Sequence, residues 1–384
     1  MIVYVDNNAT TCVAREVFEA MVPFLTDQYG NPSSPHPFGK SAATAIKTAR
    51  ANLAELLGAE TDEIIFTSCG TEGDSTAILS AVETQKNRRK IVTTAVEHAA
   101  VLNLCRRLQK HGYEIVYLPV DSKGRLNLTD AENAIDDNTA IVSVMMANNE
   151  IGNIYPVAQL AEIAHAKGAL FHTDAVQAVG KIPIDVKTAQ FDFLSLSGHK
   201  LHAPKGVGAL YVRRFIPFKS FLCGGHQERG HRAGTENVAS IAGLGMAAQL
   251  AMENMEKEQT YVKKLRDRME QGLLATCPDP QVNGDVEHRL PNTSSICFKY
   301  IEGEAILLRL YEAGHICASS GSACTSGSLE PSHVLRAMGL DYRSLHGSIR
   351  FSFSRYNTEA DVDTILEKTP PIIKSLRELS PFGR

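Results

Sequence analysis

Short apolar runs alternate with amphipathic stretches through the first half of the chain, and this alternation is its clearest pattern. The apolar runs have the length and composition of strands, and they cover residues 63–67, 90–95, 114–118, 140–145, 169–172, 191–196 and 207–212. Stretches between them, such as 99–111 and 157–167, have the spacing of amphipathic helices. Because strands that alternate with helices form mostly parallel sheets with helices on both faces, the pattern predicts an α/β fold.

A second, smaller α/β region is predicted after a long helical pattern at residues 236–274. Strand candidates there alternate with helices, the strands at 293–298, 316–318 and 348–353 and the helices at 303–313 and 358–379. We therefore expect a large domain over residues 15–254 and a small domain formed by residues 1–14 and 255–384. Ligands of such sheets bind at the carboxyl ends of the strands, so the functional residues are expected there.

Composition narrows the class of protein. The chain has 384 residues, of which 43% are hydrophobic, enough to fill the cores of two domains. A formal net charge of -4, the absence of Trp and the lack of a long basic run argue against a nucleic-acid partner. The first residues carry neither a basic segment nor a long apolar core, so we expect no membrane span and a cytoplasmic location. Eight scattered cysteines without a C-x-x-C pair fit a reducing compartment and indicate no zinc site.

A lysine and an aspartate follow two of the predicted strands. Lys200 ends a Ser-Gly-His-Lys run after one strand, and Asp174 lies at the end of another. A lysine amine can form a Schiff base with an aldehyde cofactor, and a buried carboxylate beside a pyridine nitrogen keeps that nitrogen protonated. The pair therefore predicts a pyridoxal phosphate enzyme. A single lysine in a polar loop is most often a solvated surface residue, so further motifs are needed.

Residues 68–72 follow the strand at 63–67 and open a helical run. This position favours a phosphate site, because a helix N-terminus presents free N–H groups, but an ordinary helix cap would have the same residues. The chain has no G-x-G-x-x-G motif and only the last part of a phosphate-binding loop at 34–41, which argues against nicotinamide or ATP. His98, after the strand at 90–95, could lie on a cofactor ring and move protons.

Two further features point to an amino-acid substrate and a reactive thiol. Residues 318–328 are almost all small, and Cys324 is the one thiol among them. Such a stretch is typical of an accessible loop with a thiol placed for reaction, although flexible linkers have the same composition. Arg350 lies inside the otherwise apolar strand at 348–353, where an arginine indicates a bound anion or carboxylate.

Together these segments resemble the cysteine desulfurases, fold-type I pyridoxal phosphate enzymes of the class-V aminotransferase family, and most of all their NifS branch. The resemblance runs from the Tyr-Val-Asp-Asn-Asn-Ala-Thr-Thr stretch at 4–11, through Gly-Asn-Pro-Ser-Ser at 30–34, to the Leu-Ser-Pro tail at 379–381. Cys223 and Ile151 depart from the family pattern, and neither has an assigned catalytic role.

The resemblance implies a role for each candidate residue. Lys200 would hold pyridoxal 5'-phosphate as a Schiff base, Asp174 would pair with the pyridine nitrogen and Gln177 would donate to the ring hydroxyl. His98 would stack on the ring and shuttle protons, and Cys324 would be the nucleophile. The other cofactor contacts would come from Gly70, Thr71, Asn148, Ser197, Gly198, His199 and, across a homodimer, Thr235. The substrate carboxylate would be bound by Asn148 and Arg350.

The implied activity is removal of sulfur from L-cysteine to give L-alanine and a persulfide on Cys324. The sulfur would pass to an iron-sulfur scaffold or another acceptor protein, with nitrogenase clusters as one destination, and Cys324 would briefly bind a shared [2Fe-2S] cluster. Two alternatives stay open. Another pyridoxal enzyme, such as an aminotransferase or selenocysteine lyase, would leave the Cys324 loop without a role. A non-catalytic sulfur carrier would need the thiol and no cofactor.

Overall fold

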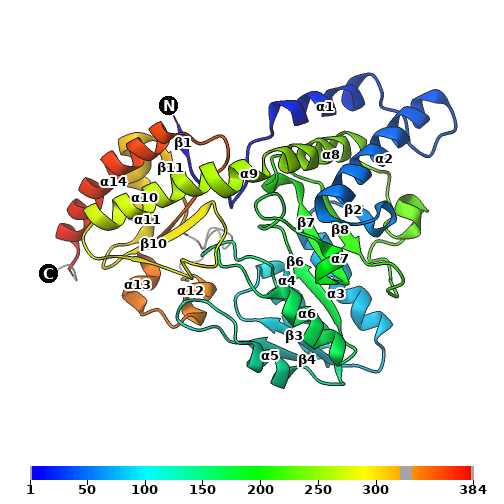
Figure 1. Ribbon diagram of the computed structural model, residues 1–384, viewed down its shortest axis with the longest axis horizontal. Coiled ribbons are helices and arrows are strands. Elements are labelled where there is room, and N and C mark those ends of the chain that lie inside the picture. Colours follow the sequence, from blue (N-terminus) through cyan, green and yellow to red (C-terminus); the bar gives the residue numbers. More distant parts are fainter. Residues whose placement is uncertain (1, 321–330, 382–384) are drawn as a thin grey trace.

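The computed structural model describes residues 2–320 and 331–381, and the predicted nucleophile Cys324 lies outside the described residues. Two lobes stand side by side in Figure 1, each built on its own sheet. The larger lobe carries most of the predicted cofactor residues, and the smaller lobe carries both ends of the described chain.

The larger lobe is built on a seven-stranded sheet with the strand order β2-β8-β7-β6-β5-β3-β4. Its strands are β2 (Ile64–Thr67), β3 (Lys90–Thr94), β4 (Glu114–Leu118), β5 (Thr139–Ser143), β6 (Leu170–Asp174), β7 (Phe193–Ser197) and β8 (Gly208–Val212). All neighbouring pairs are parallel except those of β8, which runs antiparallel to β2 and β7. The predicted mostly parallel α/β fold is confirmed.

Helices cover both faces of this sheet. They include α1 (Arg15–Thr26), α2 (Pro37–Leu57), α3 (Gly70–Thr84), α4 (Ala99–Lys110), α5 (Leu128–Ala134), α6 (Val157–Ala166), α7 (Val186–Ala189) and α8 (Val238–Glu253). Ile91 and Ile141 are buried in one cluster with α3 and α4, whereas their successors Val92 and Val142 are buried in another with α2, α6 and α8. Because successive strand residues point to opposite faces, strands that are apolar throughout bury both faces of the sheet.

The chain after α8 builds the smaller lobe around an antiparallel sheet of order β12-β10-β9, beside which β1 pairs in parallel with β11. The strands are β1 (Val3–Tyr4), β9 (Pro280–Val282), β10 (Thr293–Phe298), β11 (Ile316–Cys317) and β12 (Ser348–Ser352). The helices include α9 (Met255–Lys257), α10 (Lys263–Thr276), α11 (Gly303–Gly314), α12 (His333–Ala337), α13 (Tyr342–His346) and α14 (Glu359–Leu379). Val3 and Val5 share a buried cluster with Ile296 and Ile373, so the N-terminal strand packs in this lobe. The domain limits 15–254 and 255–384 stay a prediction.

The long helical pattern at 236–274 is not one helix. α8 ends at Glu253, and the side chain of Asn254 donates to the main-chain oxygen of Leu250 at 2.8 Å. A π-helical turn at Glu258–Val262 then precedes α10. It buries Glu258, whose carboxylate lies 4.0 Å from the guanidinium of Arg355. The apolar spacing continues through the turn, which is why periodicity alone predicts an unbroken helix.

The segment from Val5 to Thr11 runs between the two lobes and is bonded to both. Its Asn7 N–H donates to the Ser352 oxygen of β12 at 3.1 Å, and its Thr11 N–H donates to the His199 oxygen of the larger lobe at 2.9 Å. The segment therefore joins the lobes at the edge of the sheet where the cofactor residues were predicted.

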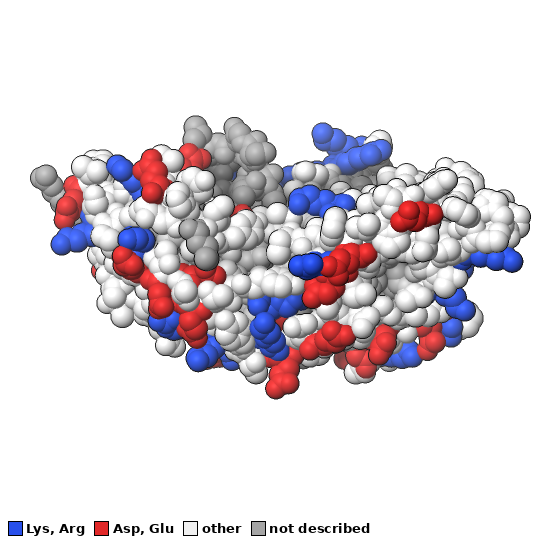
Figure 2. Space-filling view, turned by 90° about the horizontal axis from the view of Figure 1, so that it is seen from above, with Lys and Arg blue, Asp and Glu red and all other residues white. Residues whose placement is uncertain are grey.

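The surface carries charges of both signs. Figure 2 shows Lys and Arg interspersed with Asp and Glu over the face seen from above. Among the residues that the structure describes, no helix combines the length and the apolar character needed to cross a bilayer.

Candidate active site

A cavity of about 320 Å³ lies where β6 and β7 end and α3 begins. It is lined by Asn8, Ala9, Cys69, Gly70, Thr71, Asp74, His98, Met145, Ala147, Asn149, Asp174, Val176, Gln177, Ser197, His199, Lys200 and Arg350. This is the carboxyl edge of the parallel strands, the place where open α/β sheets bind their ligands. The volume is within the range that holds a small cofactor with a substrate.

Lys200 enters the cavity from a short 3-10 turn over Gly198–Lys200 that follows β7 directly. Its Nζ donates to the main-chain oxygens of Asn8 and Ala9, the latter at 2.7 Å. The amine is therefore held by carbonyls of the N-terminal segment, which also lines the cavity.

Asp174 is the last residue of β6, and it is a buried residue of the cavity lining. Its Oδ1 accepts the N–H of Val176 at 2.9 Å. Burial raises the pKa of its carboxyl, whereas His98 and Lys200 nearby favour the charged form. A carboxylate so placed can pair with a protonated ring nitrogen.

Gln177 lines the cavity beside Asp174 and is 5% exposed. Its Nε2 donates to the oxygen of Asn8 at 2.9 Å, and its Oε1 accepts from Nζ of Lys181 at 2.8 Å. Both ends of the amide are thus held by residues that are not among the predicted site residues.

The N-terminus of α3 forms part of the cavity wall. A Cβ on Gly70 would come 2.6 Å from Cγ2 of Val176, so only glycine allows the helix to begin this close. In the described structure, the side chain of Cys69 does not cap the helix. Its first N–H groups therefore face a space lined by Thr71 and Ser197, which suits an anion such as a phosphate.

Two histidines line the cavity, and each is held by an identifiable bond. His98 caps α4, accepting the N–H of Ala100 at its Nδ1 at 3.2 Å. Nδ1 of His199 lies 3.1 Å from the hydroxyl of Thr10. Burial, together with the charge of Lys200, lowers the pKa of His199 to about 4, so its ring is neutral near pH 7.

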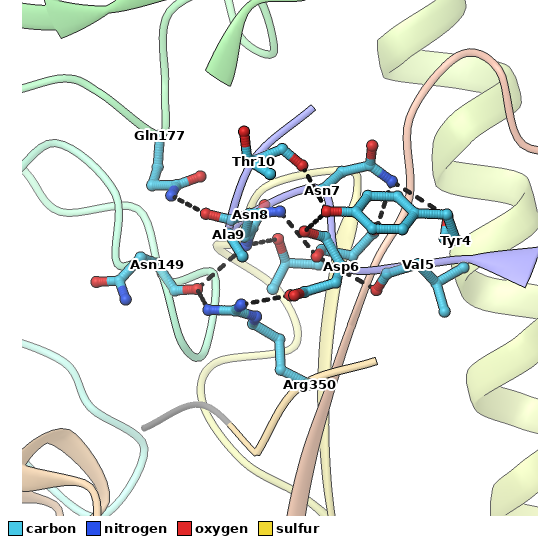
Figure 3. A network of polar contacts seen from close by, with 12 residues as sticks. Tyr4, Val5, Asp6, Asn7, Asn8, Ala9, Thr10, Asn149, Gln177 and Arg350 are labelled. Carbon is cyan, nitrogen blue, oxygen red and sulfur yellow. Dashed lines mark hydrogen bonds and ion pairs between the residues drawn. The ribbon is translucent and has the colours of Figure 1, made fainter. Parts of the chain in front are cut away.

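Arg350 reaches the cavity from β12 of the smaller lobe (Figure 3). Its Nη2 donates to Oδ1 of Asp6 at 2.7 Å, and its Nη1 donates to the oxygen of Asn149 at 2.9 Å. Within the described part of the chain, its Nε is buried without a hydrogen-bond partner. An unsatisfied guanidinium N–H at a cavity wall is a suitable donor for a substrate carboxylate.

Four of the predicted residues are not among those that line this cavity. Asn148 is fully buried: its amide donates to the Val96 oxygen at 3.0 Å and its Oδ1 accepts from the Glu150 N–H at 2.8 Å. It shapes the turn after β5, and the asparagine at the cavity is Asn149. The two adjacent asparagines are equivalent in the sequence pattern, and only the turn decides between them.

The others are Gly198, Thr235 and Cys324. Gly198 is buried, and a Cβ there would lie 2.9 Å from Cγ1 of Val207, so it serves close packing behind the cavity. Thr235 is exposed and lies outside the cavity lining of its own chain. Cys324 falls outside the described residues.

Several lining residues are not among the predicted site residues, above all Asn8, Ala9 and Asp74. Asn8 and Ala9 belong to a polar run directly after an apolar stretch. Such a run can mark residues at a strand end, but it does not indicate what they bind. Asp74 lies inside a helix, where an acidic residue gives no sequence signal of a site.

The residues present fit pyridoxal phosphate. One cavity brings together a lysine amine, a buried carboxylate and an uncapped helix N-terminus, each suited to one part of that cofactor. Arg350 adds a cationic donor from the smaller lobe.

Comparison with known proteins agrees with this geometry. The profile of the aminotransferase class-V family matches residues 3–365. A cysteine desulfurase of Gluconacetobacter diazotrophicus is 60% identical over 382 residues, covering 99% of this chain and 95% of the relative. The cysteine desulfurase NifS of Azotobacter vinelandii is 58% identical over 381 residues, covering 99% and 94%. A solved structure described as a NifS-like protein superposes with a TM-score of 0.92 at 40% identity, covering 98% of this chain and 100% of its own.

Proposed function

Because the chain belongs to the aminotransferase class-V family and is a cysteine desulfurase by its likeness to such enzymes along nearly its whole length, we propose how its own residues carry out that reaction. The substrate is L-cysteine and the products are L-alanine and a persulfide on Cys324. The observation that carries the proposal is the single cavity in which Lys200, Asp174 and Arg350 meet the N-terminus of α3.

Pyridoxal 5'-phosphate is the cofactor of this family. When bound, it supplies an aldehyde that joins to amines and a ring that accepts electron density from the substrate. Lys200 would join to the aldehyde, Asp174 would hold the ring nitrogen and Gln177 would donate to the ring hydroxyl. The phosphate would be held by the α3 N-terminus with Gly70, Thr71, Ser197 and His199.

Lys200 and His98 are the proton-transfer residues of the proposal. Both line the cavity, and Nζ of Lys200 is held by the oxygens of Asn8 and Ala9. The Lys200 amine would take the proton from the α-carbon of the substrate. His98 would hold the ring and would return protons to substrate atoms.

The substrate carboxylate is assigned to Arg350. Two of its guanidinium nitrogens are engaged by Asp6 and Asn149, which fix the plane of the group, and its buried Nε remains as a donor. We assign the second carboxylate contact to Asn149 in place of Asn148, because the Asn148 amide is occupied within its own turn.

The sulfur step uses Cys324. Its thiolate attacks the sulfur of the bound cysteine, so that a sulfur–sulfur bond forms while the carbon–sulfur bond breaks and its electron pair stays with the substrate carbon. Protonation of that carbon gives alanine. The assignment rests on the family resemblance, since Cys324 lies outside the described residues.

The acceptor of the sulfur is proposed to be an iron-sulfur scaffold or another carrier protein in the cytoplasm. The likeness to a relative named NifS favours nitrogenase clusters as the destination. Sharing of a [2Fe-2S] cluster between Cys324 and a scaffold belongs to the same proposal and rests on the resemblance alone.

The active form is proposed to be a homodimer in which Thr235 reaches the phosphate bound to the partner. Thr235 is exposed in the single chain, which fits a role outside its own cavity. Apolar side chains of α1 and the start of α2 are also exposed, with Phe18 at 58%, Leu25 at 61% and Phe38 at 50%. Exposed apolar groups of this size are a feature of protein interfaces.

The test is to incubate the purified holoprotein with L-cysteine, quantify alanine and locate the persulfide by mass spectrometry. The wild type should form both, Cys324→Ala should keep the visible absorbance of the bound cofactor and lose alanine formation, and Lys200→Ala should lose that absorbance. Full alanine formation by Cys324→Ala would remove the nucleophile assignment. A colourless wild type that still carries sulfur would favour the non-catalytic carrier.

A further inference from the structure

A second buried carboxyl group lines the cavity, and the mechanism above gives it no role. Asp74 lies in the second turn of α3, is 1% exposed and borders the same space as Asp174. In the described structure, its Oδ1 is buried without a hydrogen-bond partner. Burying an ionised carboxylate with an unsatisfied oxygen is costly, so this group requires an explanation.

Packing fixes the position of Asp74. A Cβ on the preceding Gly73 would come 2.8 Å from Oγ of Ser195, so α3 lies directly on β7. Such close contact leaves the helix no room to turn the carboxyl group toward solvent.

A chain of buried polar groups ends at Asp74. Oγ of Ser143 lies 2.9 Å from Nδ1 of His172, and Nε2 of His172 lies 2.9 Å from Oγ of Ser195. The Ser195 hydroxyl is also in hydrogen-bond contact with the Asp74 carboxyl group. Burial lowers the pKa of His172 to about 3, so the ring is neutral and has one N–H.

These contacts set the direction of the hydrogens. Because the Ser195 hydroxyl donates to Asp74, its oxygen accepts the Nε2–H of His172, and Nδ1 accepts from Ser143. Nε2 then has no lone pair for a proton on Asp74, although Oδ1 of Asp74 lies only 3.5 Å from it. An acidic proton on Oδ1 therefore needs another acceptor.

The charges around the two carboxyl groups differ. Burial raises the pKa of Asp74 strongly, and Asp174, Glu97 and Cys69 add to the rise, with only Ser195 acting against them. Asp174 is instead faced by His98 and Lys200, which favour its charged form. Because the two carboxyl groups line the same cavity and interact electrostatically, ionisation of one disfavours ionisation of the other, and the proton goes to the one without cationic neighbours.

We propose that Asp74 is a positioning residue that stays a neutral carboxylic acid and donates its hydrogen bond to Asp174, so that Asp174 remains the single negative charge beneath the cofactor. The inference rests on the proposed function, because the value of a charged Asp174 lies in holding a protonated ring nitrogen. Asp74 touches neither substrate nor reacting atoms in this role and acts through Asp174.

The first test reads the protonation state without using activity. In wild-type protein whose aspartates carry 13C in the carboxyl group, infrared spectra at neutral pH should contain an aspartic acid C=O band that shifts with the label. The band should persist in Asp174→Asn and disappear in Asp74→Asn. Glu97→Gln is the matched control, because it removes a neighbouring buried acid and should leave the labelled band in place. A wild-type spectrum without this band would show that Asp74 is ionised and would overturn the proposal.

The second test compares two neutral replacements of similar shape in the holoprotein. Asp74→Asn keeps a donor for Asp174, so the acid limb of the kcat profile should stay at the wild-type pH. Asp74→Leu removes the donor, so the limb should move upward by about one pH unit, as expected when a carboxylate loses a hydrogen bond. An unmoved limb in Asp74→Leu, or an equal shift in both variants, would overturn the inference.

The two proposals fail separately. If the wild type releases no alanine from cysteine, the proposed function fails, and the infrared result still decides the state of Asp74. If the wild type is active while the labelled band is missing, only the inference about Asp74 fails. The infrared comparison of wild type with Asp174→Asn needs no substitution at Asp74, so it stands even where those variants do not fold.

Discussion

Lys181 donates from Nζ to Oε1 of Gln177 at 2.8 Å, and the same Nζ lies 3.3 Å from Oδ1 of Asn8. A second lysine is thus buried within the shell that holds Lys200, because Asn8 also accepts from Lys200 through its main chain. Burial, and then the charge of Lys200, lowers the pKa of Lys181 to about 7. The bond to Gln177 fixes which end of that amide faces the cavity.

The first prediction is that Lys181→Met changes how stability depends on pH. The folded pKa of about 7 lies below the ordinary value of 10.5, so the unfolded chain binds an extra proton between these limits. The wild-type contribution to stability therefore rises as pH increases from 7 to 10.5, by an amount on the order of a few kcal/mol. Denaturant unfolding at pH 7 and 9.5 should show a smaller rise in the variant. The same rise in both proteins would contradict the assignment.

The second prediction is that Glu97→Gln changes the pH dependence of stability in the opposite direction. Burial raises the pKa of Glu97 to about 8, from an ordinary value of 4.5, so the folded state holds the extra proton. The contribution of Glu97 to the free energy of unfolding is fully present below pH 4.5. It is lost as pH rises through 8, by an amount on the order of a few kcal/mol. Glu97→Gln keeps the oxygen that accepts from Thr94 and the Met145 N–H, and it should flatten this fall. The exposed Glu83→Gln serves as the control and should behave as the wild type does.

The third prediction separates the two asparagines after β5. Asn148→Ala removes bonds inside the turn and should lower the free energy of unfolding by about 1–3 kcal/mol. Asn149→Ala should leave thermal unfolding of the apoprotein near the wild-type value and raise KM for cysteine. Measuring both quantities for both variants checks the assignment, and the reverse pattern would restore Asn148 as the binding residue.

The fourth prediction concerns substrate recognition by Arg350. Arg350→Lys keeps the charge and loses the planar set of donors that reaches Asp6 and Asn149, so kcat/KM for cysteine should fall about tenfold to a hundredfold. The visible absorbance of the bound cofactor should persist. The exposed Arg309→Lys is the matched control. Loss of absorbance together with activity would indicate that Arg350 holds the cavity walls and does not recognise the substrate.

The sheet could be predicted from the sequence because its strands are buried on both faces and are therefore continuous apolar runs. The pair Lys200 and Asp174 could be predicted for a related reason, since each lies at or just after the end of such a run. The contacts of Asn8, Asp74 and Lys181 could not be predicted, because the local sequence around each residue is also typical of an ordinary turn or helix. Their roles arise only when distant segments meet, as when Asn8 reaches Gln177. The break at the π-helical turn is invisible for the same reason, since Glu258 is buried there beside the distant Arg355.

The position of residues 5–11 between the lobes affects when the active site is completed during protein synthesis. These residues are translated early, yet they are bonded to Ser352 and His199, which emerge later. Until β12 has left the ribosome, a nascent chain has the Lys200 turn but lacks both Arg350 and the Ser352 oxygen that accepts from Asn7. Every residue assigned to the cofactor is made before β12, so a chain truncated before β12 is expected to have the cofactor residues without the arginine that binds the substrate carboxylate.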